Sequence, residues 1–240
     1  MKNTGPIFAL LVSVCAAGCS TSDPQALAQN DPFEPTNRAV FNFDVKLDDA
    51  VAKPVAKFYN AAVPKPAREG IHNALTNLNS PVVFANDMLQ GEATRASQTA
   101  GRFVINSTVG IAGLIDVAGK IGIPGHDEDF GQTLAVWGAQ EGSYLVLPLL
   151  GPAPPRDLVG MAVDVGFDPL TYIRFHDDTT FMIVRGGLGV LDQRAANVEN
   201  VDQIERSSID FYATTRSLSR QHRNAEISNG ENDLTTVPDL

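Results

Sequence analysis

The sequence contains few groups of residues whose types and spacing support catalysis. Its four histidines, His72, His126, His176 and His222, are scattered, and no two are spaced to bind a metal from one face of a helix. Ser143 lies outside a G-x-S-x-G turn, and the chain has no glycine-rich phosphate-binding loop. We therefore predict that the chain is not an enzyme. The rival hypothesis is a phospholipase that uses Ser143 or a metal at an acidic cluster.

The richest polar cluster is the run from His126 through Asp127 and Glu128 to Asp129. Clustered carboxylates suit hard divalent cations. Such a run is more often the start of a helix, where acids face the positive end of the helix dipole. The run His176-Asp177-Asp178 has the same two interpretations. We favour a helix start at both places and predict neither a metal nor another cofactor.

The N-terminal residues have the pattern of a secretory signal. A basic residue near the start is followed by a short apolar run over residues 7–14 and by small residues at 16–18. Cys19 comes directly after them, which resembles a lipobox. We expect residues 1–18 to be a signal peptide and Cys19 to be acylated, with an ordinary signal peptide as the alternative. Ser20 favours the outer over the inner membrane as the destination.

Cysteine counting agrees with this interpretation. The chain has two cysteines, and Cys15 leaves with the predicted signal, so Cys19 has no partner for a disulfide. Each acyl methylene that enters a bilayer contributes about 0.8 kcal/mol, so two or three chains hold a protein there almost permanently. We therefore predict a lipid-anchored protein.

Composition excludes several classes of protein. With 240 residues, 43% hydrophobic and 19% charged, the chain fits one sizeable globular domain. A net charge of −10 makes a nucleic-acid partner improbable, because phosphates would be repelled. No stretch reaches the roughly 20 apolar residues of a transmembrane helix.

Hydrophobic periodicity predicts an all-α or nearly all-α fold in a single helical domain over residues 31–225. We expect residues 19–30 to be a flexible tether and residues 226–240 a disordered acidic tail. Pro54 should kink or restart the first helix, and Ser80-Pro81 should begin a new one. The expected helices are 35–59, 66–78, 81–91, 92–108, 132–137, 156–167 and further helical segments over 179–223, with an extended run at 144–150.

Residues 109–125 are apolar, rich in glycine and nearly uncharged. One interpretation is a buried loop. On a protein anchored to a bilayer, a segment that lies in the lipid interface is an equal alternative.

Several motifs in order resemble the MlaA/VacJ lipoprotein family. The segment NDPFEPTNRAVFNFD is similar to the family's opening motif, D-P-x-E-x-x-N-R-x-x-F-x-F-N, with Asp44 in place of the frequent final Asn. The stretches VPKPAREGIHNALTNLNSP, RFVINSTVGIAGLIDVA, EDFGQTLAVWG and YLVLPLLGPAPPRD are similar to later family motifs. The resemblance covers about residues 31–227. The opening motif matches at Asp31, Pro32, Glu34, Asn37, Arg38, Phe41 and Phe43.

The resemblance implies a ring of helices in the periplasmic leaflet of the outer membrane, with a central polar channel for a phospholipid headgroup. It implies removal of misplaced phospholipid from the outer leaflet and transfer to a soluble periplasmic lipid carrier, which maintains lipid asymmetry. It also implies association with a trimeric porin. The alternative function is a structural lipoprotein that scaffolds porins or the envelope without moving lipid.

A headgroup must stay out of hydrocarbon, where bare polar groups cost several kcal/mol. We therefore expect polar side chains of the helical domain to line or shape its route, with structural ion pairs of Arg38 and Arg156 as the alternative. We also expect Gly110 and Gly113 to form a pliable wall or lid, because glycine allows unusual backbone angles. The candidate route residues are Asn37, Arg38, Asn42, Arg156 and Asp157.

Overall fold

The computed structural model describes residues 20–174 and 176–229. They form α-helices with short π- and 3-10-helical segments and one two-stranded ribbon. The elements in order are α2 (Pro24–Ala28), α3 (Glu34–Leu47), the π-helical η1 (Asp48–Ala52), α4 (Lys53–Ala62), α5 (Lys65–Gln90), α6 (Ala93–Thr108), α7 (Val117–Lys120), α8 (Phe130–Val136), β1 (Val146–Leu147), β2 (Gly151–Pro152), α9 (Pro155–Phe167), η2 (Pro169–Thr171), α10 (Asp178–Ala196), α11 (Val198–Ser207) and α12 (Phe211–Ile227).

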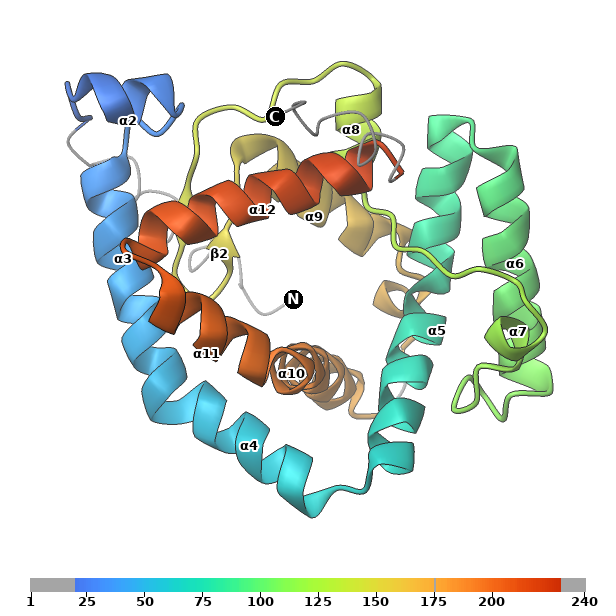
Figure 1. The fold of residues 1–240 in the computed structure, drawn as a ribbon. Helices are drawn as coiled ribbons and strands as arrows, with labels where there is room; N and C mark the ends of the chain where they lie inside the picture. Colours follow the sequence, from blue (N-terminus) through green and yellow to red (C-terminus); the bar gives the residue numbers. More distant parts are fainter. Residues whose placement is uncertain (1–19, 175, 230–240) are drawn as a thin grey trace, which may run out of the picture.

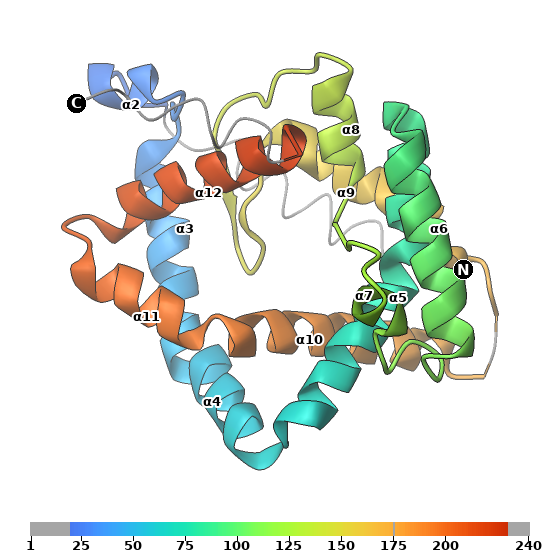
Figure 2. The same cartoon turned by 45° about the vertical axis from the view of Figure 1, so that its right-hand side comes forward.

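The helices follow the outline of a ring instead of stacking in a bundle (Figures 1 and 2). Helices α3 and α4 form one side, α5 forms the next, and α9 and α12 lie opposite α4. Helix α6 packs along α5, while α10 packs against both α4 and α5. The predicted all-α, single-domain architecture is confirmed.

Proline acts differently at two places in the first half of the chain. Pro54 lies in the first turn of α4, and the preceding residues 48–52 form the π-helical η1. The predicted restart is thus present, because a proline cannot supply the hydrogen bond of a regular helix. Pro81 does not begin a helix, so the predicted division of residues 66–91 into two helices is wrong. Helix α5 continues through Pro81, and its packing along α6 outweighs one missing backbone hydrogen bond.

The remaining helices lie close to their predicted positions. Asp129 caps α8 by accepting a hydrogen bond from the Gln132 amide, and Asp177 immediately precedes α10. Both acidic runs therefore begin helices, as predicted. The extended run at 144–150 contains only the two residues of β1, which pairs with β2 in an antiparallel ribbon.

The N-terminal boundary of the fold differs from the prediction. Residues 24–28 of the expected tether form α2, and Ala26 is buried. The Thr21 amide donates to the Pro32 carbonyl, and the Asn30 side chain donates to the Gly142 carbonyl. These contacts fold residues that lack hydrophobic periodicity. Cys19, the predicted signal peptide and residues 230–240 of the predicted tail lie outside the described residues.

Buried hydrophobic side chains form two small clusters instead of one central core. One joins α3, β1 and α12 through Phe41, Tyr144, Val146 and Tyr212. The other, made of Ala56, Tyr59, Ala195 and Val198, joins α4 to α10 and α11. Both clusters lie at joints between helices, as a ring requires.

Candidate functional site

The opening motif holds the two ends of the domain together. Asn37 Nδ2 donates to Asp31 Oδ1 at 2.7 Å and to the Tyr144 carbonyl at 2.9 Å. Asn37 Oδ1 accepts from the Val146 amide at 3.0 Å. Asn37 is 2% exposed, so a headgroup cannot reach it. Its side chain fixes β1 to α3, so of the two predicted roles, to line or to shape a route, only the second is compatible with its burial.

Helix α12 closes the ring onto the same motif. Arg216 Nη1 donates to Asp31 Oδ2 at 2.6 Å and to Glu34 Oε2 at 3.2 Å. The Tyr212 hydroxyl also donates to Asp31. Burial and the neighbouring Asp31 carboxylate raise the pKa of Tyr212, so the hydroxyl remains a donor. Arg38 completes the joint by donating to both oxygens of Asp210, at 3.0 and 2.6 Å. The alternative of a structural ion pair is thus what the structure shows for Arg38.

Arg156 and Asp157 lie at a second joint of α12. Arg156 Nε donates to Asp157 Oδ1 at 3.0 Å, and Arg223 Nη2 donates to the same oxygen at 3.1 Å. Arg223 also binds both oxygens of Asp129, at 2.6 and 2.7 Å. Burial acts to lower the pKa of Arg223, but the Asp129 carboxylate outweighs it and holds this pKa above its ordinary value. The joint therefore contains a charged pair that stays ionised.

The other predicted site residues lie apart from these joints. Asn42 is exposed on α3. Gly110 and Gly113 are buried in the turn between α6 and α7. A Cβ on Gly110 would lie 2.2 Å from the Ile115 carbonyl oxygen, and one on Gly113 would lie 2.6 Å from Asn77 Cβ. Close packing accounts for both glycines. The five predicted polar residues thus fall at two joints and one exposed position, and do not converge on one site.

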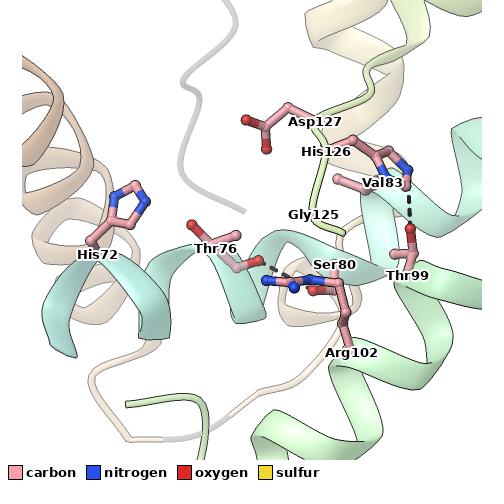
Figure 3. Close-up of a pocket in the computed structure, with 9 residues that line it drawn as sticks. All are labelled: His72, Thr76, Ser80, Val83, Thr99, Arg102, Gly125, His126 and Asp127. Atoms are coloured by element: carbon pink, nitrogen blue, oxygen red, sulfur yellow. Dashed lines mark hydrogen bonds between the residues drawn. The ribbon is translucent and has the colours of Figure 1, made fainter. Parts of the chain in front are cut away.

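Sequence reasoning missed a polar cavity of about 240 Å³ between α5, α6 and the loop before α8 (Figure 3). His72 and Thr76 on α5 and Asp127 on the loop point into the same open space. His72, Thr76 and Ser80 recur at helical spacing, which was the one signal in the sequence. The full lining is His72, Thr76, Ser80, Val83, Thr99, Arg102, Gly125, His126 and Asp127.

Hydrogen bonds fix the far wall of this cavity. His126 Nε2 lies 2.9 Å from Asp87 Oδ1 and 3.2 Å from Thr99 Oγ1, and Thr99 donates to Asp87 at 2.7 Å. A nucleophile relay would use the two ring nitrogens of histidine for two different partners. Here one nitrogen faces both neighbours, and Asp87 is fully buried. The arrangement holds the loop in place and leaves several polar side chains along the cavity.

Members of the acidic run have separate partners. Glu128 accepts from Gln90 Nε2 at 2.8 Å and from Arg95 Nη2 at 2.7 Å, and burial raises its pKa. Asp129 turns to Arg223 instead. No group of three potential metal ligands occurs in residues 20–174 and 176–229.

Many large apolar side chains of the ring are exposed. Phe43, Val51, Val55 and Phe58 on α3, η1 and α4 are 47–73% exposed. Apolar side chains of the glycine-rich segment are exposed as well, including Val109, at 67% exposure. The interpretation of this segment as a buried loop is therefore wrong for these side chains. No helix in the described part of the chain has both the length and the apolar character needed to span a membrane. Such a surface suits the interface of a bilayer.

Comparison with known proteins identifies the family to which this chain belongs. The sequence pattern of the family described as "MlaA lipoprotein" matches residues 29–226. An intermembrane phospholipid transport system lipoprotein, MlaA, from Haemophilus influenzae is 32% identical over 238 residues, which are 96% of this chain and 93% of that protein. The Escherichia coli protein of the same name is 31% identical over 218 residues, covering 89% of this chain and 85% of its own.

A solved structure gives the same result for the fold. It is described as the structural basis for maintenance of bacterial outer membrane lipid asymmetry, and it superposes with a TM-score of 0.74 at 31% identity. The match covers 82% of this chain and 98% of the other. The joints described above lie within the region that the family pattern matches. This chain therefore belongs to the MlaA lipoprotein family.

Proposed function

We propose that this chain is the outer-membrane lipoprotein of an intermembrane phospholipid transport system and that it maintains lipid asymmetry. The observation that carries the proposal is a ring of helices with many exposed apolar side chains, in a member of the MlaA lipoprotein family. The relatives from Haemophilus influenzae and Escherichia coli bear the name of such a system. A protein of this shape can sit among acyl chains without crossing the bilayer.

The mechanism follows from the cost of moving a charged headgroup. Bare polar groups in hydrocarbon cost several kcal/mol, so a passage must replace the headgroup's water with polar groups. His72, Thr76 and Asp127, which point into the same cavity, would supply both donors and acceptors for this purpose. Asn42 remains a candidate because it is exposed on α3. Misplaced phospholipid of the outer leaflet would pass its headgroup through the ring, while its acyl chains follow the apolar surface.

The fixed frame of the ring is part of this mechanism. Arg38 and Asp157 shape the route through their ion pairs with Asp210 and Arg223, which hold α12 against α3 and α9, and Arg156 lies beside Asp157 on α9. Gly110 and Gly113 would form a packed wall, because neither has room for a side chain. In this proposal the frame stays closed while lipid moves.

Location and partners complete the proposal. Acylation of Cys19 would hold the protein in the periplasmic leaflet, and a soluble periplasmic carrier would receive the lipid. Association with a trimeric porin would place the ring beside a protein wall that excludes acyl chains on one side.

The test is the amount of phospholipid on the surface of intact cells that lack this gene. We expect exposure to rise and the wild-type gene to reverse it, whereas Cys19→Ala, which lacks the anchor, would not. Unchanged exposure after deletion would favour the scaffold hypothesis. Incubation of the purified protein with labelled phospholipid separates transfer from hydrolysis, because a transfer protein releases no free fatty acid.

A further inference from the structure

We propose that a second cavity, next to α12, binds the phosphodiester of a phospholipid headgroup. This cavity has a volume of about 820 Å³, which lies in the range of small-molecule sites. Its lining comes from the segment that follows α8, the first turn of α9, the end of α12 and Asn30. The inference rests on the proposed function for the source of its ligand. The lining residues are Asn30, Ala135, Gly138, Ala139, Gln140, Glu141, Gly142, Ser143, Arg156, Arg220, Asn224 and Ile227.

Arg156 supplies the charge that an anion would bind. Its side chain is only 8% exposed, yet it is partnered by a single side-chain hydrogen bond, from Nε to Asp157. Its two terminal amino groups have no hydrogen-bond partner among residues 20–174 and 176–229. A guanidinium group has five N–H donors in a planar fork, which matches the oxygens of a phosphate. A buried guanidinium with free donors beside an open cavity is therefore prepared for such a ligand.

The balance of charge in the cavity favours an anion. Its charged lining residues are Arg156, Arg220 and Glu141, in a chain whose net charge is −10. The Glu141 carboxylate is already occupied, by Arg220 at 3.0 Å and by Asn30 at 3.3 Å. Asp157 is shared with Arg223, so it only partly neutralises Arg156. The lining itself thus carries two guanidinium groups and one carboxylate, with the Asp157 carboxylate beside Arg156.

The rest of the lining suits a headgroup better than a bare ion. The side chains of Gln140, Ser143 and Asn224 make no hydrogen bond with another described residue, so their donors are free for ester oxygens or a glycerol hydroxyl. Ala135 and Ile227 offer apolar contact beside them. A phosphodiester that carries glycerol uses both kinds of surface, whereas inorganic phosphate would use only the first.

Equilibrium dialysis of the purified full-length mature chain in detergent tests the site. The probes are labelled glycerophosphoglycerol, which has the phosphodiester but no acyl chains, inorganic phosphate and glycerol. We expect saturable binding of glycerophosphoglycerol, weaker binding of phosphate and none of glycerol. Arg156→Gln should raise the dissociation constant about tenfold or more, because it removes a charge-assisted contact.

A second variant guards against misfolding of the first. Gln140 is exposed, so Gln140→Glu adds a negative charge to the cavity without breaking an ion pair, and it should weaken binding several-fold. Gln193→Glu on α10 and Arg174→Gln are matched controls outside the cavity lining, and both should bind as wild type does.

Unchanged affinity in both Arg156→Gln and Gln140→Glu would overturn the inference, as would equal affinity for glycerophosphoglycerol and inorganic phosphate. The cell assay distinguishes the two proposals. If dialysis shows no site while the wild-type gene still restores lipid asymmetry, only this inference fails. If the gene does not restore asymmetry, the proposed function fails.

Discussion

Replacement of Asp31 by alanine should destabilise the ring more than any exposed substitution, because Asp31 is fully buried between the two ends of the domain. The carboxylate accepts hydrogen bonds from Asn37, Tyr212 and Arg216. Two neutral donors contribute about 1 kcal/mol each, and the charged donor contributes about 1.5–3 kcal/mol. Arg216 keeps Glu34 at 3.2 Å, so its charge would not be left entirely unpaired. We therefore expect Asp31→Ala to lower the free energy of unfolding by about 3.5–5 kcal/mol.

Thermal unfolding followed by circular dichroism in a mild detergent measures this effect. In a domain of this size, 1 kcal/mol corresponds to about 2–4 °C, so the Tm should fall by about 10 °C. The matched control is Asp127→Ala, which removes an exposed carboxylate and should change stability by less than about 0.5 kcal/mol. A loss below about 1 kcal/mol in Asp31→Ala would refute the reasoning that this buried joint closes the ring.

Three further predictions concern charge, packing and the outer surface. Burial acts to raise the pKa of Asp129, but Arg223 holds it below the ordinary value of about 4; its contribution is present above that value and lost as pH falls through the lowered pKa. Asp129→Asn, which can keep the helix cap, should lower the Tm at pH 7. In a pH series of melting curves, the difference from wild type should begin to shrink below about pH 4 and vanish only below the lowered pKa of Asp129. Gly113→Ala should lower the free energy of unfolding by about 2 kcal/mol or more, because the residue has φ +88° and faces Asn77. Gly101 lies in α6 with nothing within 4 Å of an added Cβ, so Gly101→Ala should raise the free energy of unfolding by about 0.5–1 kcal/mol in the same melting assay. Phe58 is 73% exposed, and burial of a phenylalanine contributes about 1.5–3 kcal/mol, so Phe58→Glu should weaken vesicle flotation of the non-acylated chain about tenfold or more at unchanged Tm. Wild-type flotation of that variant would show that this face does not enter the bilayer.

Local patterns predicted the elements well because they depend on neighbours in the sequence. Helical periodicity located most helices, and the acids at Asp129 and Asp177 marked two helix starts. Pro81 shows the limit of such reasoning. Its local preference is to begin a helix, but the packing of α5 along α6 comes from residues further along the chain, and it decides the outcome.

The roles of polar residues were harder to predict, because they depend on partners far away in the sequence. Asn37 is of a polar residue type that could line a channel. In the structure, however, its side-chain amide is hydrogen-bonded to Asp31, Tyr144 and Val146. The cavity that contains His126 was missed because Asp87, the partner of that histidine, lies 39 positions earlier in the chain. A single sequence contains no signal for such pairs.

The arginines of α12 make the same point about the architecture. Arg216, Arg220 and Arg223 recur at helical spacing, a pattern that normally indicates a solvated face. In the structure their side chains are only 10–21% exposed, and each binds an acid from a different part of the chain. A ring has no central core to hold its last helix, so its closure must come from contacts along one seam. Ion pairs suit that seam because their geometry fixes the position of α12. The apolar side chains that a core would bury then remain exposed, where a bilayer can receive them.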